Sequence, residues 1–485
     1  MSEKEIPVAL SFDDVLLLPQ RSDVLPADIK LNTPLTKNIS LHIPMLSSAM
    51  DTVSESKLAI ALAREGGMGV IHRNCPIEEQ VDMVSRVKRS ENIVIEQPLT
   101  VQADLTIAAL KELMRKTGIS GFPVVDPAQT LQGIVTRRDI WILEDENQKI
   151  DHVMTPRPKV ITAPAGCNQE EARSILYTHR IEKLPLVDTD DRLVGLMTRA
   201  DIEKRLMFQD ASKDHNGHLR VGAAIGTDND SLERAHALTA TGCDALFIDA
   251  ATGHTDRVIK NLQALHSEYP EIPVIAGNVV TPEGANDLIK AGAAAIKVGV
   301  GPGSICTTRM VAGVGVPQFS AIKNVATICH EKDIPLIADG GIRYSGDIIK
   351  ALAAGASCIM VGSLFAGTEE SPGRTIRWQG RTFKEYRGMG SISAMRKGSS
   401  DRYGQNASGK LVPEGVEARV PYKGKMSDLL FQLMGGVRSG MGYIGAENIK
   451  ALKTKARFIR ITSGGLTESH PHDITLTEEP INYSV

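Results

Sequence analysis

The chain has 485 residues, which is enough for more than one domain and for a large hydrophobic core. Its 55 basic and 58 acidic residues nearly balance, so composition gives no reason to expect a nucleic-acid partner or a membrane-surface partner. The six cysteines form no C-x-x-C pair, a pattern typical of a reducing compartment. The sequence shows neither a signal-peptide pattern nor an apolar run of about 18 residues, and we expect a soluble, cytoplasmic protein.

The N-terminal part of the chain, residues 1–92, predicts a strand, a helix and a second strand. Short apolar runs occupy residues 43–47 and 68–71. Between them, residues 54–64 carry apolar side chains at helical spacing. This order predicts a pair of parallel strands, as in α/β folds.

Residues 93–206 contain an internal repeat. The segment 121–140 (G-F-P-V-V-D-P-A-Q-T-L-Q-G-I-V-T-R-R-D-I) matches the segment 183–202 (K-L-P-L-V-D-T-D-D-R-L-V-G-L-M-T-R-A-D-I) at a constant offset of 62 residues. Each copy predicts a helix, a strand, a turn at Asp, a strand that ends in T-R, and a second helix that opens at Asp. Two such copies can bury a shared face that one copy alone could not bury.

This repeat closely resembles a tandem pair of cystathionine-beta-synthase (CBS) domains, which implies a regulatory (Bateman) domain. In that family the T-x-x-D segment often holds the ribose and phosphates of an adenine or guanine nucleotide, so the resemblance implies a purine nucleotide as ligand. The matching residues are Thr136, Asp139, Thr198 and Asp201. The alternative is that the aspartates cap helices and the threonines end strands.

From residue 207 to residue 485 the strand-helix pattern resumes. Six apolar runs are each followed within a few residues by Gly, Asp or Asn, and most lead into a helical segment. They are residues 221–225, 245–248, 273–275, 294–298, 335–337 and 358–361. With the two units of residues 1–92 they make eight, which predicts an α/β (β/α)8 TIM barrel with the repeat inserted after the second unit.

Residues just beyond the strand C-termini form the active site in such a barrel. They are Ser47, Ser48, Asp249, Asn278, 299–306, 339–341, Gly362 and Ser363. The loop K-V-G-V-G-P-G-S-I-C-T-T-R (297–309) places Cys306 after three glycines and close to Arg309. A cation and unpaired backbone N–H groups stabilise a thiolate, so the loop indicates a nucleophile. The alternative is that Cys306 is a small buried hydrophobe.

Two loops near the end of the barrel predict a phosphate site. A-D-G-G-I-R (338–343) and V-G-S (361–363) provide glycines where barrels commonly bind phosphate on backbone N–H groups. Asp339 offers oxygens suited to ribose hydroxyls, so we expect a nucleotide monophosphate near the cysteine. Beyond these loops, residues 371–437 are polar and have few apolar runs, which predicts a mobile flap rather than packed structure.

These motifs together resemble the inosine-5'-monophosphate (IMP) dehydrogenase family. The matching segments are F-D-D-V-L-L-L-P (12–19), 299–309, 338–343, Y-R-G-M-G-S (386–391), 399–403 and L-V-P-E-G (411–415). With the inserted repeat, the resemblance covers nearly the full chain. It implies an NAD-dependent oxidoreductase that converts IMP to xanthosine monophosphate (XMP), the committed step of guanine nucleotide synthesis.

The resemblance also implies a mechanism. Cys306 attacks C2 of the IMP base, hydride passes to NAD, and a covalent thioimidate of XMP remains on the sulfur. The flap then closes into the vacated cofactor site, where Arg402 and Tyr403, assisted by Thr308, activate the water that releases XMP. Arginine is normally too basic to accept a proton, so this role requires a desolvated guanidinium beside Tyr403. Without the resemblance, a surface ion pair between Asp401 and Arg402 would be favoured.

Three ligand sets follow from the resemblance. Contacts to IMP are implied for Ser304, Asp339, Gly341, Gly362, Ser363, Tyr386, Met389, Gly390 and Glu414. Positions near NAD are Asp249, Asn278 and Gly299. A potassium ion is implied on the carbonyls of Gly301, Gly303 and Cys306, completed by residues matching Glu468, Ser469 and His470 of a neighbouring subunit. A shared ion site implies an oligomer, and the family is tetrameric, with octamers in some members.

Three other functions compete with this interpretation. A GMP reductase shares the barrel and the cysteine loop, but ordinarily lacks the CBS pair and the Arg-Tyr flap dyad. A catalytically quiet nucleotide sensor would need neither Cys306 nor that dyad. A flavin-dependent barrel oxidoreductase shares the phosphate loops. One departure from the family pattern is Ala250, where a hydroxyl-bearing residue is usual, and we expect it to affect cofactor affinity.

Overall fold

The computed structural model describes residues 6–91, 94–143, 145–200, 202–203, 208–228, 230–406, 409–474, 477 and 482–483. The chain forms two compact units. One comprises the chain up to Ser90 and from Asp210 onward, and is called the barrel unit here; the other, Glu91–Gln209, is called the inserted unit. Among the described residues we find no helix with the length and apolar character needed to span a membrane.

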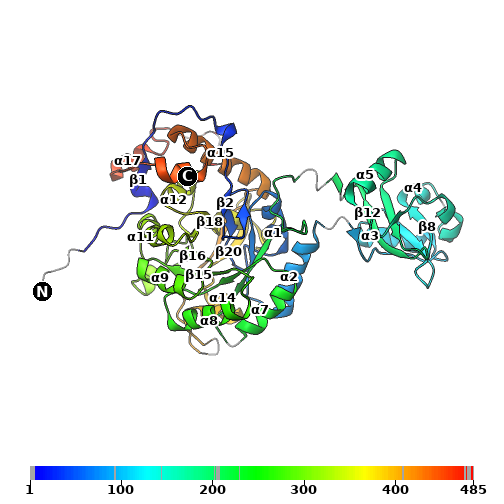
Figure 1. Ribbon diagram of the computed structural model, residues 1–485, viewed down its shortest axis with the longest axis horizontal. Helices are drawn as coiled ribbons and strands as arrows, with labels where there is room; N and C mark the ends of the chain where they lie inside the picture. Colours follow the sequence, from blue (N-terminus) through cyan, green and yellow to red (C-terminus); the bar gives the residue numbers. More distant parts are fainter. Residues whose placement is uncertain are drawn as a thin grey trace. The chain divides into compact units, whose positions relative to one another are not determined.

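The barrel unit is built on eight parallel strands that close into a ring (Figure 1). In chain order they are β4 (Met45–Ser47), β5 (Gly69–Ile71), β13 (Val221–Ile225), β14 (Ala245–Ile248), β15 (Val274–Val279), β16 (Ala295–Val298), β17 (Leu336–Asp339) and β18 (Cys358–Val361). Neighbours pair in the order β4-β18-β17-β16-β15-β14-β13-β5, and a parallel bridge between Leu46 and Met68 completes the ring. The predicted (β/α)8 barrel is thus confirmed.

Helices surround the strands and connect each one to the next (Figure 1). They are α1 (Ser56–Arg64), α2 (Ile77–Arg89), α7 (Ser231–Ala240), α8 (Asp256–Glu268), α9 (Pro282–Lys290), α11 (Gln318–Glu331) and α12 (Ser345–Ala353). Local sequence fixes several of their starts. Thr255 and Thr281 accept hydrogen bonds from backbone N–H groups of the first turn, and Pro282 occupies a first-turn position where no N–H is needed.

Further elements pack around the barrel. Helices α15 (Met426–Ile444) and α16 (Ile449–Lys455) pack against α12, and β1 (Val15–Leu17) pairs antiparallel with β22 (Phe458–Arg460). Shorter elements are β2 (Thr33–Pro34), β3 (Ser40–Leu41), α10 (Thr308–Val311), α13 (Ser363–Ala366), α17 (Ser463–Glu468) and the 3-10 turns η1 (Phe12–Asp14) and η2 (Pro26–Asp28).

The interior of the barrel is packed with apolar side chains. Leu46, Phe247, Ile275 and Met360 belong to one buried cluster. Phe247 fits because Gly222 on the neighbouring strand has no side chain: a Cβ there would lie 2.5 Å from Phe247 Cε2. A filled interior means that ligands must bind at the rim, beyond the strand ends.

The two points where the chain leaves and re-enters the barrel unit are fastened to the barrel. Lys88, near the end of α2, places its Nζ 3.0 Å from Asp214 Oδ2 and 2.6 Å from Asp244 Oδ2. Ser212 donates its backbone N–H to the carbonyl of Ala63. All three charged groups are largely buried, so the pairing fixes both chain ends at the barrel surface.

The inserted unit contains two small sheets of related build. One holds β7 (Gly121–Val125), β8 (Leu131–Thr136) and β9 (Thr155–Pro156); the other holds β10 (Ala163–Pro164), β11 (Lys183–Val187), β12 (Leu193–Thr198) and β6 (Val94–Ile95). Its helices are α3 (Ile107–Thr117), α4 (Arg137–Ile140) and α5 (Gln169–Thr178), with turns η3 (Ile150–His152) and η4 (Arg157–Lys159). The repeat extends to the backbone, since Gln129 and Asp191 occupy matching turns with φ of 65° and 64°.

The first T-x-x-D segment differs in one detail from the capping alternative. Thr136 ends β8 and is itself the N-cap of α4, while Asp139 lies in the first turn and accepts hydrogen bonds from the backbone N–H and hydroxyl of Thr136 at 2.6 and 2.7 Å. Asp139 therefore completes a capping box instead of starting the helix. Thr198 ends β12, and Asp201 lies outside the described residues.

The segment 371–437, predicted to be unpacked, contains regular structure at both ends. β19 (Thr375–Trp378), β20 (Arg381–Arg387) and β21 (Glu417–Pro421) form an antiparallel sheet. Between them lie α14 (Ile392–Ala394), the π-type turn η5 (Met395–Ser399) and the 3-10 turn η6 (Ser400–Tyr403). The boundary at 437 is wrong, because α15 already begins at Met426 and buries an apolar face. The mobility of the intervening segment stays a prediction.

We predict that Gly222→Ala destabilises the barrel unit by about 1–3 kcal/mol, because the added methyl group collides with the Phe247 ring. The urea midpoint of unfolding measures the loss. Adding Phe247→Leu should restore part of it. Gly435→Ala, exposed on α15 with open space around its Cβ position, is the control and should not lower stability. Equal losses at both glycines would contradict the packing described.

Candidate active site

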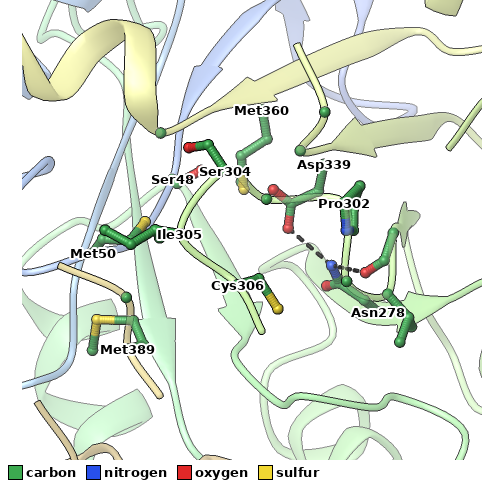
Figure 2. Close-up of a pocket in the computed structure, with 18 of the residues that line it drawn as sticks. Ser48, Met50, Asn278, Pro302, Ser304, Ile305, Cys306, Asp339, Met360 and Met389 are labelled. Carbon is green, nitrogen blue, oxygen red and sulfur yellow. Dashed lines mark hydrogen bonds between the residues drawn. The ribbon is translucent and has the colours of Figure 1, made fainter. Parts of the chain in front are cut away.

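A cavity of about 410 Å³ lies at the carboxyl ends of the barrel strands. Its walls combine the loops after the strands with the segment 386–415. The predicted residues that line it are Ser304, Asp339, Gly341, Gly362, Ser363, Tyr386, Met389, Gly390, Glu414, Asp249, Asn278, Gly299, Gly301, Gly303, Cys306, Thr308, Arg402 and Tyr403. Figure 2 shows part of this wall, with Ser304, Ile305 and Cys306 on one loop and the Cys306 sulfur directed into open space.

The Cys306 thiol makes a hydrogen bond to a hydroxyl group, and the backbone of the residue is held by its neighbours. Its Sγ donates to Thr308 Oγ1 at 3.2 Å, and the side chain is half-buried. The backbone of Cys306 bridges Gly415 in antiparallel fashion, and Thr307 N donates to Glu414 O at 2.9 Å. The cysteine loop is thus pinned between the barrel and the segment after residue 411.

Glycine and arginine shape this loop. Gly299 has φ of 147°, and a Cβ there would lie 2.2 Å from the carbonyl oxygen of Asp339, so only glycine fits. Arg309, expected to stabilise a thiolate, donates to the carbonyls of Val300 at 3.3 Å and Val316 at 2.6 Å. Its hydrogen bonds therefore hold the loop backbone.

The seventh and eighth strand loops form a small-residue wall around Tyr386. Gly341 has φ of 79°, and a Cβ at Gly362 would lie 2.9 Å from Tyr386 Oη. Burial raises the pKa of Tyr386 to about 12, although a hydrogen bond with Ser304 acts in the opposite direction. The phenol therefore stays protonated and available as a donor at neutral pH. Met50 and Met389 lie close together on the same side of the cavity (Figure 2).

Asn278 joins three of the loops. Its Nδ2 donates to Asp339 Oδ2 at 2.9 Å and to the carbonyl of Gly299 at 2.7 Å (Figure 2). Its Oδ1 accepts from the buried Lys297 Nζ, which also lies 3.6 Å from Asp339 Oδ2. Burial lowers the pKa of Lys297, while the nearby Asp339 carboxylate opposes that effect. These contacts fix the orientation of the Asp339 carboxylate.

Asp249 is the centre of a buried charge network. Arg402 Nη1 donates to its Oδ1, and Arg73 Nε lies 3.6 Å from its Oδ2. Burial alone raises the pKa of the Asp249 carboxyl, but the two guanidinium groups outweigh burial and hold it below its ordinary value. Burial also lowers the pKa of Arg402, yet the Asp249 carboxylate more than compensates and places it above the ordinary arginine value. Both groups are therefore charged.

Tyr403 lies against Gly390. A Cβ at Gly390 would be 2.8 Å from the Cζ and Oη atoms of Tyr403, so the absence of a side chain lets the phenol approach the cavity wall. Burial raises the pKa of Tyr403 to about 12, partly offset by the charge of Arg402. The phenol is consequently neutral in the physiological range.

Some predicted residues lie elsewhere. Glu468, Ser469 and His470 are at or just beyond α17 and do not line the cavity of this chain; His470 Nδ1 lies 2.8 Å from the Tyr483 hydroxyl. Ser47 is fully buried and accepts from Ser54 and from the backbone N–H of Val70. Ala250 is also buried and is not among the lining residues, whereas Ala251 is.

Other lining or supporting residues were missed by sequence reasoning. Met50, Lys297 and Gln318 line the cavity, and Arg73 lies directly behind Asp249. Gln318 Nε2 donates to the carbonyls of Val298 and Asp339. Lys297 could have been recognised from the sequence, because a lysine at the end of an apolar strand is buried and must find buried partners.

The inserted unit has a cavity of its own, of about 570 Å³. Five basic side chains line it: Arg137, Arg138, Lys159, Arg180 and Lys183. Thr136 and Asp139 are also in its wall, while Thr198 is not. The excess of positive charge suits an anionic ligand.

Comparison with known proteins places the chain in a family. The family model described as IMP dehydrogenase / GMP reductase domain matches residues 9–472. The chain belongs to this family. It is 55% identical to the inosine-5'-monophosphate dehydrogenase of Aquifex aeolicus, with 100% of this chain and 99% of the relative covered, and 51% identical to that of Bacillus subtilis, with 98% of each covered.

A solved structure adds a correction. The GMP reductase of Trypanosoma brucei, in complex with guanosine 5'-monophosphate, matches with a TM-score of 0.89 and 40% identity, covering 97% of this chain and 99% of that chain. GMP reductases were expected ordinarily to lack the inserted pair. Because this GMP reductase matches almost the whole chain, the presence of an insertion does not separate the two activities within the family.

We predict that iodoacetamide at pH 7.5 alkylates Cys306 well before any other cysteine. Burial raises the pKa of the thiols of Cys75, Cys243, Cys329 and Cys358 to about 12, so these remain protonated and poorly nucleophilic. Peptide mass mapping against time gives the order of modification. The control is Cys306→Ala, which should lose the fast phase. Modification of Cys75 at the same rate would contradict the expectation.

Proposed function

We propose that the chain is an IMP dehydrogenase that oxidises IMP to XMP with NAD. The observation that carries this proposal is the cavity itself, where Cys306 and the Arg402–Tyr403 pair meet the glycine loops after β17 and β18. A nucleophile, a water-activating pair and a phosphate site are the parts that such a reaction needs. The names of the full-length relatives support the same activity.

The reaction is proposed to begin with the Cys306 thiolate, which attacks C2 of IMP and forms an S–C2 bond. Bound NAD supplies the acceptor for the hydride that leaves C2 with its electron pair. Cys306 then holds XMP as a thioimidate. Water attacks C2, the S–C2 bond breaks and the sulfur keeps the electron pair. The sum is IMP, NAD and water converted to XMP, NADH and a proton.

Arg402 and Tyr403 are proposed to activate the water, and the ion pair between Arg402 and Asp249 limits when they can do so. While Arg402 pairs with Asp249 it keeps its proton, so it can accept one only when that pair is separated. Tyr403 keeps its own proton and can orient the water as a donor or acceptor. Thr308, whose Oγ1 accepts a hydrogen bond from Cys306 Sγ, is proposed to assist at the same atom.

The nucleotide is proposed to lie with its phosphate on Ser304, Gly341, Gly362, Ser363 and Tyr386, its ribose on Asp339 and its base near Met389, Gly390 and Glu414. Asp339 suits the ribose because Asn278 and Lys297 fix its carboxylate. Asp249, Asn278 and Gly299 would hold NAD. Asp249 offers a buried, charged acceptor for a hydroxyl once Arg402 withdraws.

A potassium site and an oligomer are also proposed. The carbonyls of Gly301, Gly303 and Cys306 belong to one tight turn, in which Cys306 N donates to Gly303 O at 3.1 Å. Glu468, Ser469 and His470 lie apart from this turn in their own chain, which is consistent with their serving a neighbouring subunit of a homotetramer or octamer. We place the enzyme in the cytoplasm because all six cysteines are free.

We predict that NADH and XMP form in equal amounts over many turnovers when the protein is mixed with IMP, NAD and potassium. Absorbance follows NADH, and chromatography quantifies XMP. Activity with GMP and NADPH in place of these substrates would instead support the GMP reductase alternative. Lack of both activities would overturn the proposal and leave the nucleotide-sensor alternative.

Two variants separate the chemical steps within this assay. Cys306→Ala should lose NADH formation entirely, because no S–C2 bond can form. Tyr403→Phe should retain a single burst of NADH and lower steady turnover by about 10²-fold, since only the water step needs the phenol. A Cys306→Ala chain that still forms NADH would show that the thiol is not the nucleophile.

The inserted unit is proposed to be a CBS pair that binds a purine nucleotide in its basic cavity. Lys183 lines this cavity and donates to Ser120 at 3.1 Å, while burial lowers its pKa. Lys183→Met should weaken ATP or GTP binding about 10-fold or more in calorimetry. Lys111→Met, which removes a lysine from an exposed ion pair of the same unit, is the control. Equal affinities of the two variants would exclude this cavity as the site.

A further inference from the structure

The loop after β5 lies directly beneath the flap turn η6. Arg73, in this loop, is only 8% exposed, and its Nη2 donates to both carboxylate oxygens of Asp401, at 3.0 and 2.8 Å. Asp401 precedes the Arg402–Tyr403 pair in the chain. The ionic contact therefore fastens a barrel loop to the residue next to the catalytic pair.

Arg73 also touches the partner of Arg402. Its Nε lies 3.6 Å from Asp249 Oδ2, and Arg402 Nη1 donates to the other oxygen of the same carboxylate. The Arg73 guanidinium thus stands between two carboxylates, one on the flap and one on the barrel. Without it, those two negative charges would face each other with one cation fewer, and Asp249 would be left with Arg402 and Lys297.

Asn74, the residue after Arg73, also lies close to the flap. A Cβ at Gly398 would lie 3.1 Å from Asn74 Oδ1, and Gly398 has φ of 142°. Asn74 is itself fixed, because its Nδ2 donates to Asp51 Oδ2 at 2.7 Å. The segment 73–74 consequently contacts both η5 and η6.

We propose that Arg73 is a positioning residue for the water step: by binding Asp401 and Asp249 together, it holds the flap turn where Arg402 and Tyr403 face Cys306. This inference rests on the proposed function and deepens it. Arg73 does not line the cavity among the described residues, so it acts through the flap and not on the nucleotide. Formation of the S–C2 bond and loss of hydride do not need the closed flap, and should not need Arg73.

The test compares Arg73→Met with the unmodified full-length chain in rapid-mixing kinetics with IMP and NAD. At saturating NAD we expect the NADH burst to keep its rate within about twofold, while steady XMP release falls on the order of 10-fold to 100-fold. The XMP adduct on Cys306 should accumulate and be visible by intact mass. Inhibition by high NAD should strengthen, because a flap that closes poorly leaves the cofactor site open.

Further variants distinguish positioning from general destabilisation. Asp401→Asn should reproduce the effect, and combining it with Arg73→Met should add little, as expected for two ends of one contact. Arg73→Lys should recover part of the activity. Arg86→Gln, which breaks an exposed ion pair on α2, should change nothing. If Arg73→Met does not fold, the Asp401→Asn and Arg73→Lys chains provide the comparison.

Failure of the proposed function and failure of the proposed role of Arg73 give different results. An unmodified chain that forms no NADH overturns the proposed function. An active unmodified chain beside an Arg73→Met chain that loses the burst and the steady rate in equal proportion overturns only the role of Arg73. Fully additive effects of Arg73→Met and Asp401→Asn would also overturn it, since the two residues would then not act through one contact.

Discussion

The active end of this molecule depends on one buried carboxylate. Asp249 follows β14 and is 6% exposed, which would be unfavourable for a charged group without compensating cations. Arg73 supplies one cation from the barrel and Arg402 supplies another from the flap. A single side chain therefore links the barrel, the turn η6 and the cavity, and this arrangement is stable because its charge is matched from both sides.

The sequence was most informative where the role of a residue follows from its own strand or backbone geometry. Eight apolar runs, most of them leading into a helical segment, predicted the barrel strands, because a parallel strand buried on both faces must be apolar. The glycines around Cys306 and after β17 also had local causes, such as the collision that a Cβ at Gly299 would make with Asp339. Such residues reveal their role through the backbone geometry that they alone allow.

The sequence was least informative where a role depends on a distant partner. Arg73 and Asp401 are separated by more than three hundred residues, and nothing near either one indicates the other. Ser47 was expected in the cavity, but strand ends alternate their side chains between rim and interior, and it points to Ser54. The start of α15 was missed because its buried leucines follow a polar stretch that suggested continued loop.

The ion pairs of Lys88 with Asp214 and Asp244 bear on how the inserted unit can change in evolution. They secure the chain on both sides of the inserted unit, so the barrel keeps its own contacts whatever lies between residues 90 and 210. A gene could exchange or lose that unit and still encode a barrel with intact strand pairing and an intact rim. The inserted unit can thus be acquired, replaced or abandoned as a module, while the cavity at the carboxyl ends of the barrel strands is inherited unchanged.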